Sequence, residues 1–409
     1  MNDAGFMRHA LRLARRGCGE TSPNPMVGVV LVKNGKIIGR GWHRRAGLPH
    51  AEIEALRDAQ KRGHSPRGAT LFVTLEPCCT HGRTPPCTDA IISAGIKKVV
   101  IGATDPNPKH AGKGFKILLR AGIEVVAFGK GRARHSVRAI SSLANQRRAR
   151  SDAPYQQLAD ECAKLNETFN HWIVRRTPFV TVKAAMTLDG KIATASGESK
   201  WITGEKARAH GMKLRQGVDA ILVGINTILA DDPSLTFRPV QSPKSKAQSQ
   251  KSLRRIVLDS MARTPLDAKI VSDEFAALTT IVVSEAAPKN RIEALVKKAA
   301  VIIAPTAKSK LKIQNSKLDL IWLLKKLGAE NVTSLLAEGG GEVNASFLLG
   351  GFANRAAFFY APKILGGRGS RKGVAGEGAA NLADAVQLKE IEWKRIGGDL
   401  LMTARVVAR

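Results

Sequence analysis

The sequence has few cysteines and no long apolar run. Five cysteines in 409 residues are too few for a disulfide scaffold. No apolar stretch approaches the about 18 residues that a membrane-spanning helix needs. The first fifteen residues are polar and basic rather than the apolar core of a signal peptide. We therefore expect a cytoplasmic protein with no membrane span.

Acidic and aromatic residues are also scarce. The 34 Asp and Glu residues against 65 Lys and Arg residues give a formal net charge of +31, which by itself suggests a nucleic-acid partner. The basic residues are nevertheless dispersed along both halves, and aromatic residues make up only 5% of the chain, so no basic tract with interleaved aromatic side chains is formed. The composition argues against nucleic acid as the partner and suits small substrates that carry phosphate. The origin of the excess charge stays open.

The stretch from His50 to Cys87 carries the residue types of a catalytic zinc site. Such a site uses three imidazole or thiolate ligands and leaves a fourth position open for water. His50, Cys78 and Cys87 supply that set, and Glu52 is placed to carry protons. His-x-Glu followed by Pro-Cys and a later Cys is the pattern of the zinc-dependent nucleobase deaminases. We predict one Zn²⁺ per chain, with Glu52 as the catalytic acid and base.

The spacing of the two thiolates separates classes of deaminase. Enzymes that act on cytidine, or on adenosine in tRNA, usually hold zinc with Cys-x-x-Cys. Here eight residues separate Cys78 from Cys87. The loop between them includes Arg83, whose planar guanidinium suits a phosphate or ribose at the pocket mouth. This spacing argues against tRNA editing. Cys79 is an alternative to Cys78 as a ligand, although the usual Pro-Cys order favours Cys78.

Alternating strand and helix patterns predict two α/β domains joined by a helical connector. The boundaries expected from the patterns are 1–129, 130–177 and 178–409. In the first domain we expect a short N-terminal amphipathic helix, strands at 27–32, 37–42, 70–74, 98–102 and 124–126, and helices at 51–59, 88–94 and 115–121. In the second we expect a sheet completed by six strands, at 179–184, 221–224, 255–258, 280–283, 334–337 and 356–360. Residues 241–252 are of low complexity and predict a surface loop.

Motifs in both halves resemble the bifunctional riboflavin-biosynthesis deaminase–reductase family. The first half contains Ser-Pro-Asn-Pro-Met-Val-Gly, Pro-His-Ala-Glu, Thr-Leu-Glu-Pro-Cys, Gly-Arg-Thr-Pro-Pro-Cys and Asp-Pro-Asn-Pro. The second half contains Lys-Ala-Ala-Met-Thr-Leu-Asp-Gly-Lys-Ile-Ala, Gly-Glu-Ser-Lys-Trp-Ile-Thr, Asp-Asp-Pro-Ser-Leu-Thr and Ala-Glu-Gly-Gly. Because both halves match in the same order, the resemblance is specific and covers nearly the whole chain except the connector and the low-complexity stretch.

The resemblance implies two folds and two reactions. An N-terminal cytidine-deaminase-like three-layer α/β/α domain would use zinc to deaminate 2,5-diamino-6-(5-phosphoribosylamino)pyrimidin-4(3H)-one. A dihydrofolate-reductase-like α/β domain would then reduce the ribosyl group of 5-amino-6-(5-phosphoribosylamino)uracil to ribityl with NADPH. We also expect a homo-oligomer. An inactive reductase half is an alternative, but Lys183, Ser199, Asp231 and Glu338 are all retained.

The resemblance also implies site residues. The family loop usually has a histidine two residues after the first zinc-binding cysteine, but Thr80 stands there and His81 follows it. A helix that begins near Glu342 would offer its N-terminus to a pyrophosphate. The implied deaminase substrate contacts are Asn24, His43, His81, Arg83, Asp105 and Asn107. The implied reductase substrate contacts are Ser199, Arg215, Leu235, Arg238 and Glu338, and the implied NADPH contacts are Ala185, Trp201, Thr227, Asp231, Ser260, Gly339, Gly340 and Gly341.

Overall fold

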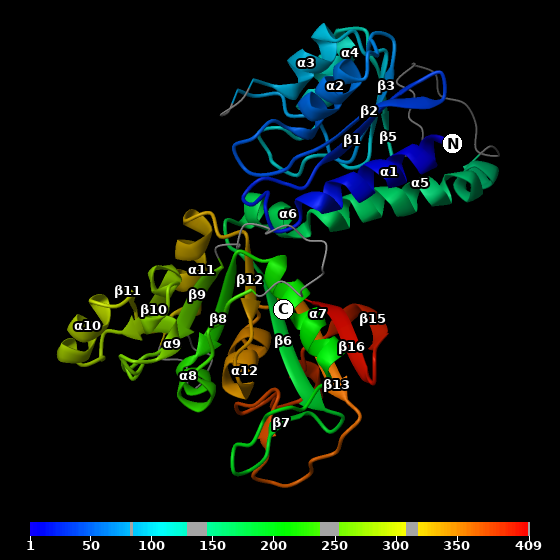
Figure 1. The fold of residues 1–409 in the computed structure, drawn as a ribbon. Helices are drawn as coiled ribbons and strands as arrows, with labels where there is room; N and C mark the ends of the chain where they lie inside the picture. Colours follow the sequence, from blue (N-terminus) through cyan, green and yellow to red (C-terminus); the bar gives the residue numbers. More distant parts are fainter. Residues whose placement is uncertain (82–84, 129–144, 238–252, 308–317, 408–409) are drawn as a thin grey trace. The chain divides into compact units, whose positions relative to one another are not determined.

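The chain forms two compact units, Met1–Arg175 and Arg176–Arg409, in a computed structural model (Figure 1). The structure describes residues 1–81, 85–128, 145–237, 253–307 and 318–407. Within these ranges no helix is both long enough and apolar enough to cross a membrane. Each unit is built on its own sheet and is described separately.

A five-stranded sheet with the order β2-β1-β3-β4-β5 forms the centre of the first unit. Asn34 and Gly35 both have positive φ angles, as the tight turn of a two-residue hairpin requires, and they join β1 to its antiparallel partner β2. β3, β4 and β5 run parallel to one another. The strands are β1 (Gly28–Lys33), β2 (Lys36–Trp42), β3 (Thr70–Val73), β4 (Lys98–Ile101) and β5 (Glu124–Ala127).

Helices cover both faces of this sheet (Figure 1). Alternate residues of β1 separate the two cores, since Val29 and Leu31 pack with one set of helices and Val30 and Val32 with the other. One face carries α2 (Ala51–Lys61), α3 (Cys87–Ser93) and α4 (Lys113–Arg120), and the opposite face carries α1 (Asp3–Ala14) and α5 (Asn145–Leu165). The predicted three-layer α/β/α architecture is confirmed.

The described part of the expected connector consists of α5 and α6 (Glu167–Arg175) and groups with the first unit. Leu158 and Cys162 of α5 are buried in the core on the α1 face. Between the two helices, Asn166 accepts a hydrogen bond from the Met26 amide at 2.7 Å and donates one to the Met26 carbonyl at 2.9 Å. These contacts tie the helices to the loop that precedes β1.

Glycines on β2 set the position of α2. A Cβ atom at Gly41 would lie closer to the Ala51 carbonyl oxygen and the Ala55 amide than real Cβ contacts allow, and Gly39 makes a similar approach farther along the helix. Glycine therefore lets the helix pack directly on the strand. Because α2 begins at Ala51, this packing also fixes where His50 lies.

A nine-stranded sheet with the order β11-β10-β9-β8-β12-β6-β13-β16-β15 forms the second unit. The prediction that six strands complete this sheet is wrong, because β11 (Ala300–Ala304), β15 (Leu388–Ile396) and β16 (Asp399–Val406) extend it. β15 is rich in charged residues and almost wholly exposed, and its apolar alternation is limited to Ile391 and Trp393, which is too short to signal a strand. The six predicted strands are β6 (Phe179–Thr187), β8 (Ala220–Gly224), β9 (Arg254–Leu258), β10 (Thr279–Ser284), β12 (Ser334–Ala337) and β13 (Arg355–Ala361), and β7 (Lys191–Ala193) pairs separately with β14 (Arg371–Lys372). The expected loop at 241–252 lies outside the described residues.

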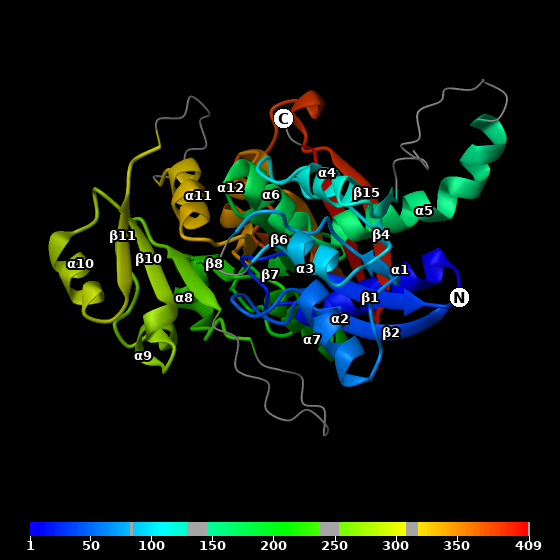
Figure 2. The same ribbon diagram turned by 90° about the horizontal axis from the view of Figure 1, so that it is seen from above.

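The seven strands from β11 to β13 in this order are parallel. Their carboxyl ends therefore share one edge, where open α/β sheets bind ligands. Figure 2 shows the sheet between its two helical layers. One layer contains α7 (Glu205–Gln216), α8 (Ile225–Asp231), α9 (Lys269–Ser272) and α10 (Lys289–Val296), and the other contains α11 (Leu320–Ala329) and α12 (Gly341–Leu349).

Candidate active sites

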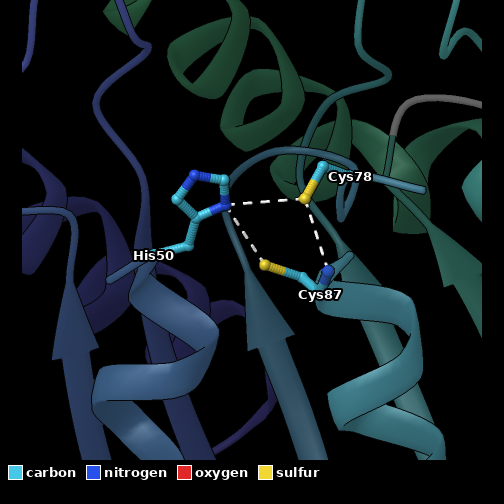
Figure 3. A group of neighbouring side chains, drawn as sticks. All are labelled: His50, Cys78 and Cys87. Atoms are coloured by element: carbon cyan, nitrogen blue, oxygen red, sulfur yellow. Dashed lines mark hydrogen bonds between the residues drawn. The ribbon is translucent and has the colours of Figure 1, made fainter. Parts of the chain in front are cut away.

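Three zinc-ligand side chains converge at the start of two helices (Figure 3). His50 is the N-cap of α2, Cys78 lies in the loop after β3, and Cys87 is the first residue of α3. Their donor atoms all lie within 4.8 Å of one another. His50 Nδ1 is 3.5 Å from Cys78 Sγ and 3.3 Å from Cys87 Sγ, and the Cys87 amide donates to Cys78 Sγ at 3.3 Å.

The pKa values of the two cysteine thiols are shifted in opposite directions. A hydrogen bond from Cys87 lowers the pKa of Cys78 to about 4, and the same contact together with burial raises the pKa of Cys87. The hydrogen bond with Cys78 also raises the pKa of His50. Two thiolates and an imidazole so close together are stabilised by a cation, and this donor set with one open position suits Zn²⁺.

Glu52 lies in the first turn of α2 and is buried. Burial raises the pKa of its carboxyl group to about 7, and the Cys78 thiolate adds to this effect. A carboxyl group that exchanges its proton near neutral pH can act as both general base and general acid. Its place beside the cysteines matches the role that the sequence pattern predicts.

A cavity of about 300 Å³ opens at this cluster. Four of the implied substrate contacts line it, namely Asn24, His43, Asp105 and Asn107. Its other lining residues are Pro23, Pro25, Val27, His50, Glu52, Leu75, Glu76, Cys78, His110, Phe169, Trp172 and Ile173. The wall formed by the last three comes from α6, and sequence analysis missed it because nothing local links residues 169–173 to a zinc motif.

Hydrogen bonds hold His43 and Asn24 in place. The amide of Asn24 lies 3.1 Å from His43 Nε2, and His43 Nδ1 lies 3.1 Å from the carbonyl oxygen of Pro49. Burial lowers the pKa of His43, so the ring is neutral, donates from Nδ1 and accepts at Nε2. Asn24 is therefore oriented by its neighbour before any substrate binds.

Glu76 organises the loop that carries Asp105 and Asn107, although sequence analysis gave it no role. Its carboxylate accepts hydrogen bonds from the amides of Asp105 at 3.2 Å, Gly112 at 3.0 Å and Gly114 at 3.0 Å. Asp105 in turn accepts one from the Asn107 amide at 2.8 Å. The only sequence signal was its place in the Leu-Glu-Pro-Cys motif.

The two remaining implied deaminase contacts are His81 and Arg83. His81 is exposed and does not line the cavity, and Arg83 lies outside the described residues. A histidine that the sequence analysis did not single out, His110, lines the cavity instead.

A larger hollow of about 410 Å³ lies along β2 between α1 and α2. Its lining is mainly basic and includes Arg16 and Arg40. Its two carboxylates are bound by arginines, with Glu54 3.3 Å from Arg44 and Asp58 3.0 Å from Arg62. This basic hollow holds no metal-ligand cluster among the described residues. The zinc-ligand cavity is therefore the candidate site for catalysis.

In the second unit, Glu338 at the end of β12 forms a buried ion pair. Its oxygens accept hydrogen bonds from Arg215 Nε at 3.1 Å and Nη2 at 2.7 Å, and Lys183 Nζ lies 3.9 Å away. Burial alone would raise the pKa of Glu338, but the two cations outweigh it and lower the pKa to about 2. Arg215 also donates to the carbonyl oxygen of Thr236 at 3.1 Å, beside Leu235, which is buried with φ 50°. Arg238 lies outside the described residues.

Several implied NADPH contacts follow the carboxyl ends of the parallel strands. Thr227 follows β8, Ser260 follows β9 and the segment 339–341 follows β12, while Ala185 lies near the end of β6. α12 begins at Gly341, so the glycines lead into a helix N-terminus that can receive a pyrophosphate. This arrangement fits a dinucleotide.

The remaining implied reductase residues are more exposed. Trp201 is 65% exposed, with the Arg208 guanidinium 4.6 Å from its ring centroid. Asp231 lies 3.4 Å from Lys200, and Ser199 is half-buried.

Comparison with known proteins gives matches to both units. Residues 1–103 match the family of the cytidine and deoxycytidylate deaminase zinc-binding region, and residues 178–402 match the RibD C-terminal domain. Riboflavin biosynthesis protein RibD of Actinobacillus pleuropneumoniae is 40% identical over 100% of this chain and 96% of that protein, and its counterpart in Escherichia coli K12 is 36% identical over 98% and 99%.

Solved structures agree with the sequence matches. RibD of Acinetobacter baumannii (form 1) superposes with a TM-score of 0.79 at 32% identity and covers 99% of both chains. A diaminohydroxyphosphoribosylaminopyrimidine deaminase/5-amino-6-(5-phosphoribosylamino)uracil reductase of Thermotoga maritima has a TM-score of 0.73 at 32% identity and covers 99% of this chain and 98% of that one. The predicted fold of both domains, deaminase-like and reductase-like, is thereby confirmed.

Proposed function

Since the chain belongs to the RibD family of riboflavin-biosynthesis proteins, we propose how its residues divide the two reactions of this bifunctional deaminase and reductase. The first unit deaminates 2,5-diamino-6-(5-phosphoribosylamino)pyrimidin-4(3H)-one with one zinc ion. The second reduces the ribosyl group of the resulting uracil compound to ribityl with NADPH. The observation that carries the assignment of the first site is the convergence of His50, Cys78 and Cys87 next to buried Glu52.

In the deaminase site, His50, Cys78 and Cys87 would hold the zinc. The metal supplies Lewis acidity, which makes water nucleophilic near neutral pH. Glu52 accepts one proton of the attacking water and passes it to a ring nitrogen. It then accepts the proton of the newly added hydroxyl group and passes it to the leaving amino group. A C–O bond forms, the C–N bond breaks, and ammonia leaves. Asn24 and His43, already fixed by their mutual hydrogen bond, bind the pyrimidine together with Asp105 and Asn107.

Replacing a zinc ligand tests the ligand set. We expect Cys87→Ser to lower bound zinc from about one ion per chain to near zero and ammonia release by at least about a hundredfold, because the metal activates the water. Zinc is measured by mass spectrometry of purified protein. Cys79→Ser and Cys18→Ser serve as controls that keep their zinc. Loss of zinc from Cys79→Ser with retention in Cys78→Ser would instead assign Cys79 as the ligand.

In the reductase site, we propose that the ion-paired side chains of Lys183, Arg215 and Glu338 contact the substrate. Ser199, Leu235 and Arg238 are further substrate contacts. NADPH supplies the hydride. Ala185, Trp201, Thr227, Asp231, Ser260 and the glycines Gly339, Gly340 and Gly341 bind the cofactor. The chain's task is to orient the reacting carbon against it and to exclude water.

We further propose that the protein is a homodimer joined through β15. This strand is the edge of the second sheet and exposes Ile391 by 52% and Trp393 by 60%. A long exposed edge strand with large apolar side chains is a surface that proteins normally cover.

Light scattering tests this proposal. The wild-type mass should be twice that of the chain, and Trp393→Glu should shift it toward the monomer because a buried charge at the interface lacks a partner. Val296→Glu replaces an equally exposed apolar residue on α10 and should not change the mass. A monomeric wild type would contradict the dimer.

A further inference from the structure

We propose that His110 is a substrate-binding residue of the deaminase site and that its imidazole donates a hydrogen bond to the phosphate of the phosphoribosyl group. The proposal rests on the proposed function and deepens it. It assigns a role to a residue that the sequence motifs did not single out.

His110 lies in the loop between β4 and α4 and lines the zinc-ligand cavity. Its Nε2 atom is 3.4 Å from the Thr80 hydroxyl, and its Nδ1 atom is 3.7 Å from Cys79 Sγ. The ring therefore stands between the loop that follows Cys78 and the loop that Glu76 holds. Both contacts are at the long end of the hydrogen-bonding range, so a substrate oxygen can replace one of them.

The contact with Thr80 relates His110 to the loop that follows the first zinc-binding cysteine. Thr80 occupies the place, two residues after the first zinc-binding cysteine, where this family usually has a histidine. His81, the neighbouring candidate, is exposed and does not line the cavity. Thr80 is exposed as well and does not line the cavity. Of these three residues only His110 does so, and its imidazole contacts Thr80 from another loop.

Burial fixes which end of the substrate meets His110. The reacting carbon must lie beside Glu52 and the metal ligands, and Glu52 is 3% exposed. The phosphoribosyl group must then extend away from Glu52 to a part of the wall that solvent reaches, and His110 is one of the half-buried residues of that wall. Lys109 and Lys113 flank His110 and are both exposed, so the local charge favours an anion there.

Several other polar groups of the described cavity wall are unsuited to bind the phosphate. Glu76 is acidic and already accepts hydrogen bonds from the amides of Gly112 and Gly114. Asp105 is acidic, and the ring nitrogens of His43 are engaged by Asn24 and Pro49. The proposed function assigns Asn24 and Asn107 to the pyrimidine, and the imidazole of His110 is then a donor available to the phosphate.

The test compares two substrates in the zinc-loaded full chain. For His110→Ala we expect the KM for ammonia release from the phosphorylated substrate to rise about ten- to a hundredfold, the usual cost of losing a hydrogen bond to a charged group. The kcat should change by less than about threefold, since the residue binds rather than transfers a proton. With the dephosphorylated riboside as substrate, the KM of the variant and that of the wild type should differ by less than about threefold, because neither protein can form the hydrogen bond to phosphate. His64→Ala, an exposed histidine of the same unit that does not line the cavity, is the matched control.

A second variant separates binding from loop packing. Adding Thr80→His to His110→Ala places an imidazole at the residue that His110 contacts and should recover at least about tenfold of the lost kcat/KM. An unchanged KM in His110→Ala, an equal loss with both substrates, or a loss found in His81→Ala instead would overturn the proposal. A wild type that releases no ammonia would overturn the proposed deaminase function itself, and the reductase reaction of each variant reports that the chain is folded.

Discussion

Glu52→Gln should lower ammonia release about 10²–10⁴-fold, the range expected for loss of a general acid and base. The amide keeps the size of the side chain but cannot accept the water proton or return it. Because Glu52 is not a metal ligand, zinc should stay at one ion per chain. Reduction of the deaminated compound takes place in the other unit and should stay within about twofold of wild type, since distant independent sites behave additively.

The matched control is Glu54→Gln on the same helix. Glu54 pairs with Arg44 and Arg57 and does not line the zinc-ligand cavity, so its loss should leave ammonia release nearly unchanged. Ammonia is measured enzymatically and zinc by mass spectrometry on the same preparations. Loss of both activities in Glu52→Gln would contradict two independent sites, and full activity would remove Glu52 from the mechanism.

Glu338→Gln should abolish reduction and destabilise the second unit. The carboxylate is buried against Arg215 and Lys183, and removing one partner of a buried charge network typically costs about 3–5 kcal/mol. The same change removes the group that orients both cations, so NADPH oxidation on the deaminated compound should be lost while ammonia release by the first unit persists. Glu330→Gln, whose partners Arg254 and Lys326 are more exposed, should cost less than about 1 kcal/mol.

The pH dependence gives an independent check on Glu338. Its folded pKa of about 2 lies below the ordinary value of 4.5, so its contribution to stability is present above about pH 4.5 and is lost as the pH falls toward 2. The full difference corresponds to about 3 kcal/mol. Hydrogen exchange in β6 and β12 should therefore show wild type and Glu338→Gln converging as the pH falls. A constant difference over that range would contradict the ion pair.

Sequence reasoning placed the zinc-ligand set because its signals are local. Residue type and spacing identified His50, Cys78 and Cys87, and the structure brings all three together. Most strands were also predictable, since period-two apolar patterns mark half-buried strands and short apolar runs mark buried ones. β15 shows only a brief alternation at Ile391 and Trp393 among charged residues, and its strand character depends on pairing with β16.

What the sequence could not supply are contacts between distant segments. Asn166 holds the loop at Met26, 140 residues earlier, and Trp172 completes the cavity wall from the same helical region. Glu76 binds the loop between β4 and α4, which carries His110, and no periodicity indicates the course of that loop. These roles arise from tertiary packing, which local propensity does not encode.

The measurement that tests the central claim most directly is ammonia release by the zinc-loaded chain from the diaminopyrimidine ribosyl phosphate, followed with and without NADPH. We predict ammonia in the absence of NADPH, and NADPH oxidation that begins only after ammonia appears. Ammonia without any oxidation would leave a deaminase joined to an inactive reductase half. NADPH oxidation that precedes ammonia, or no ammonia from zinc-loaded protein, would contradict the assignment of the two sites and their order.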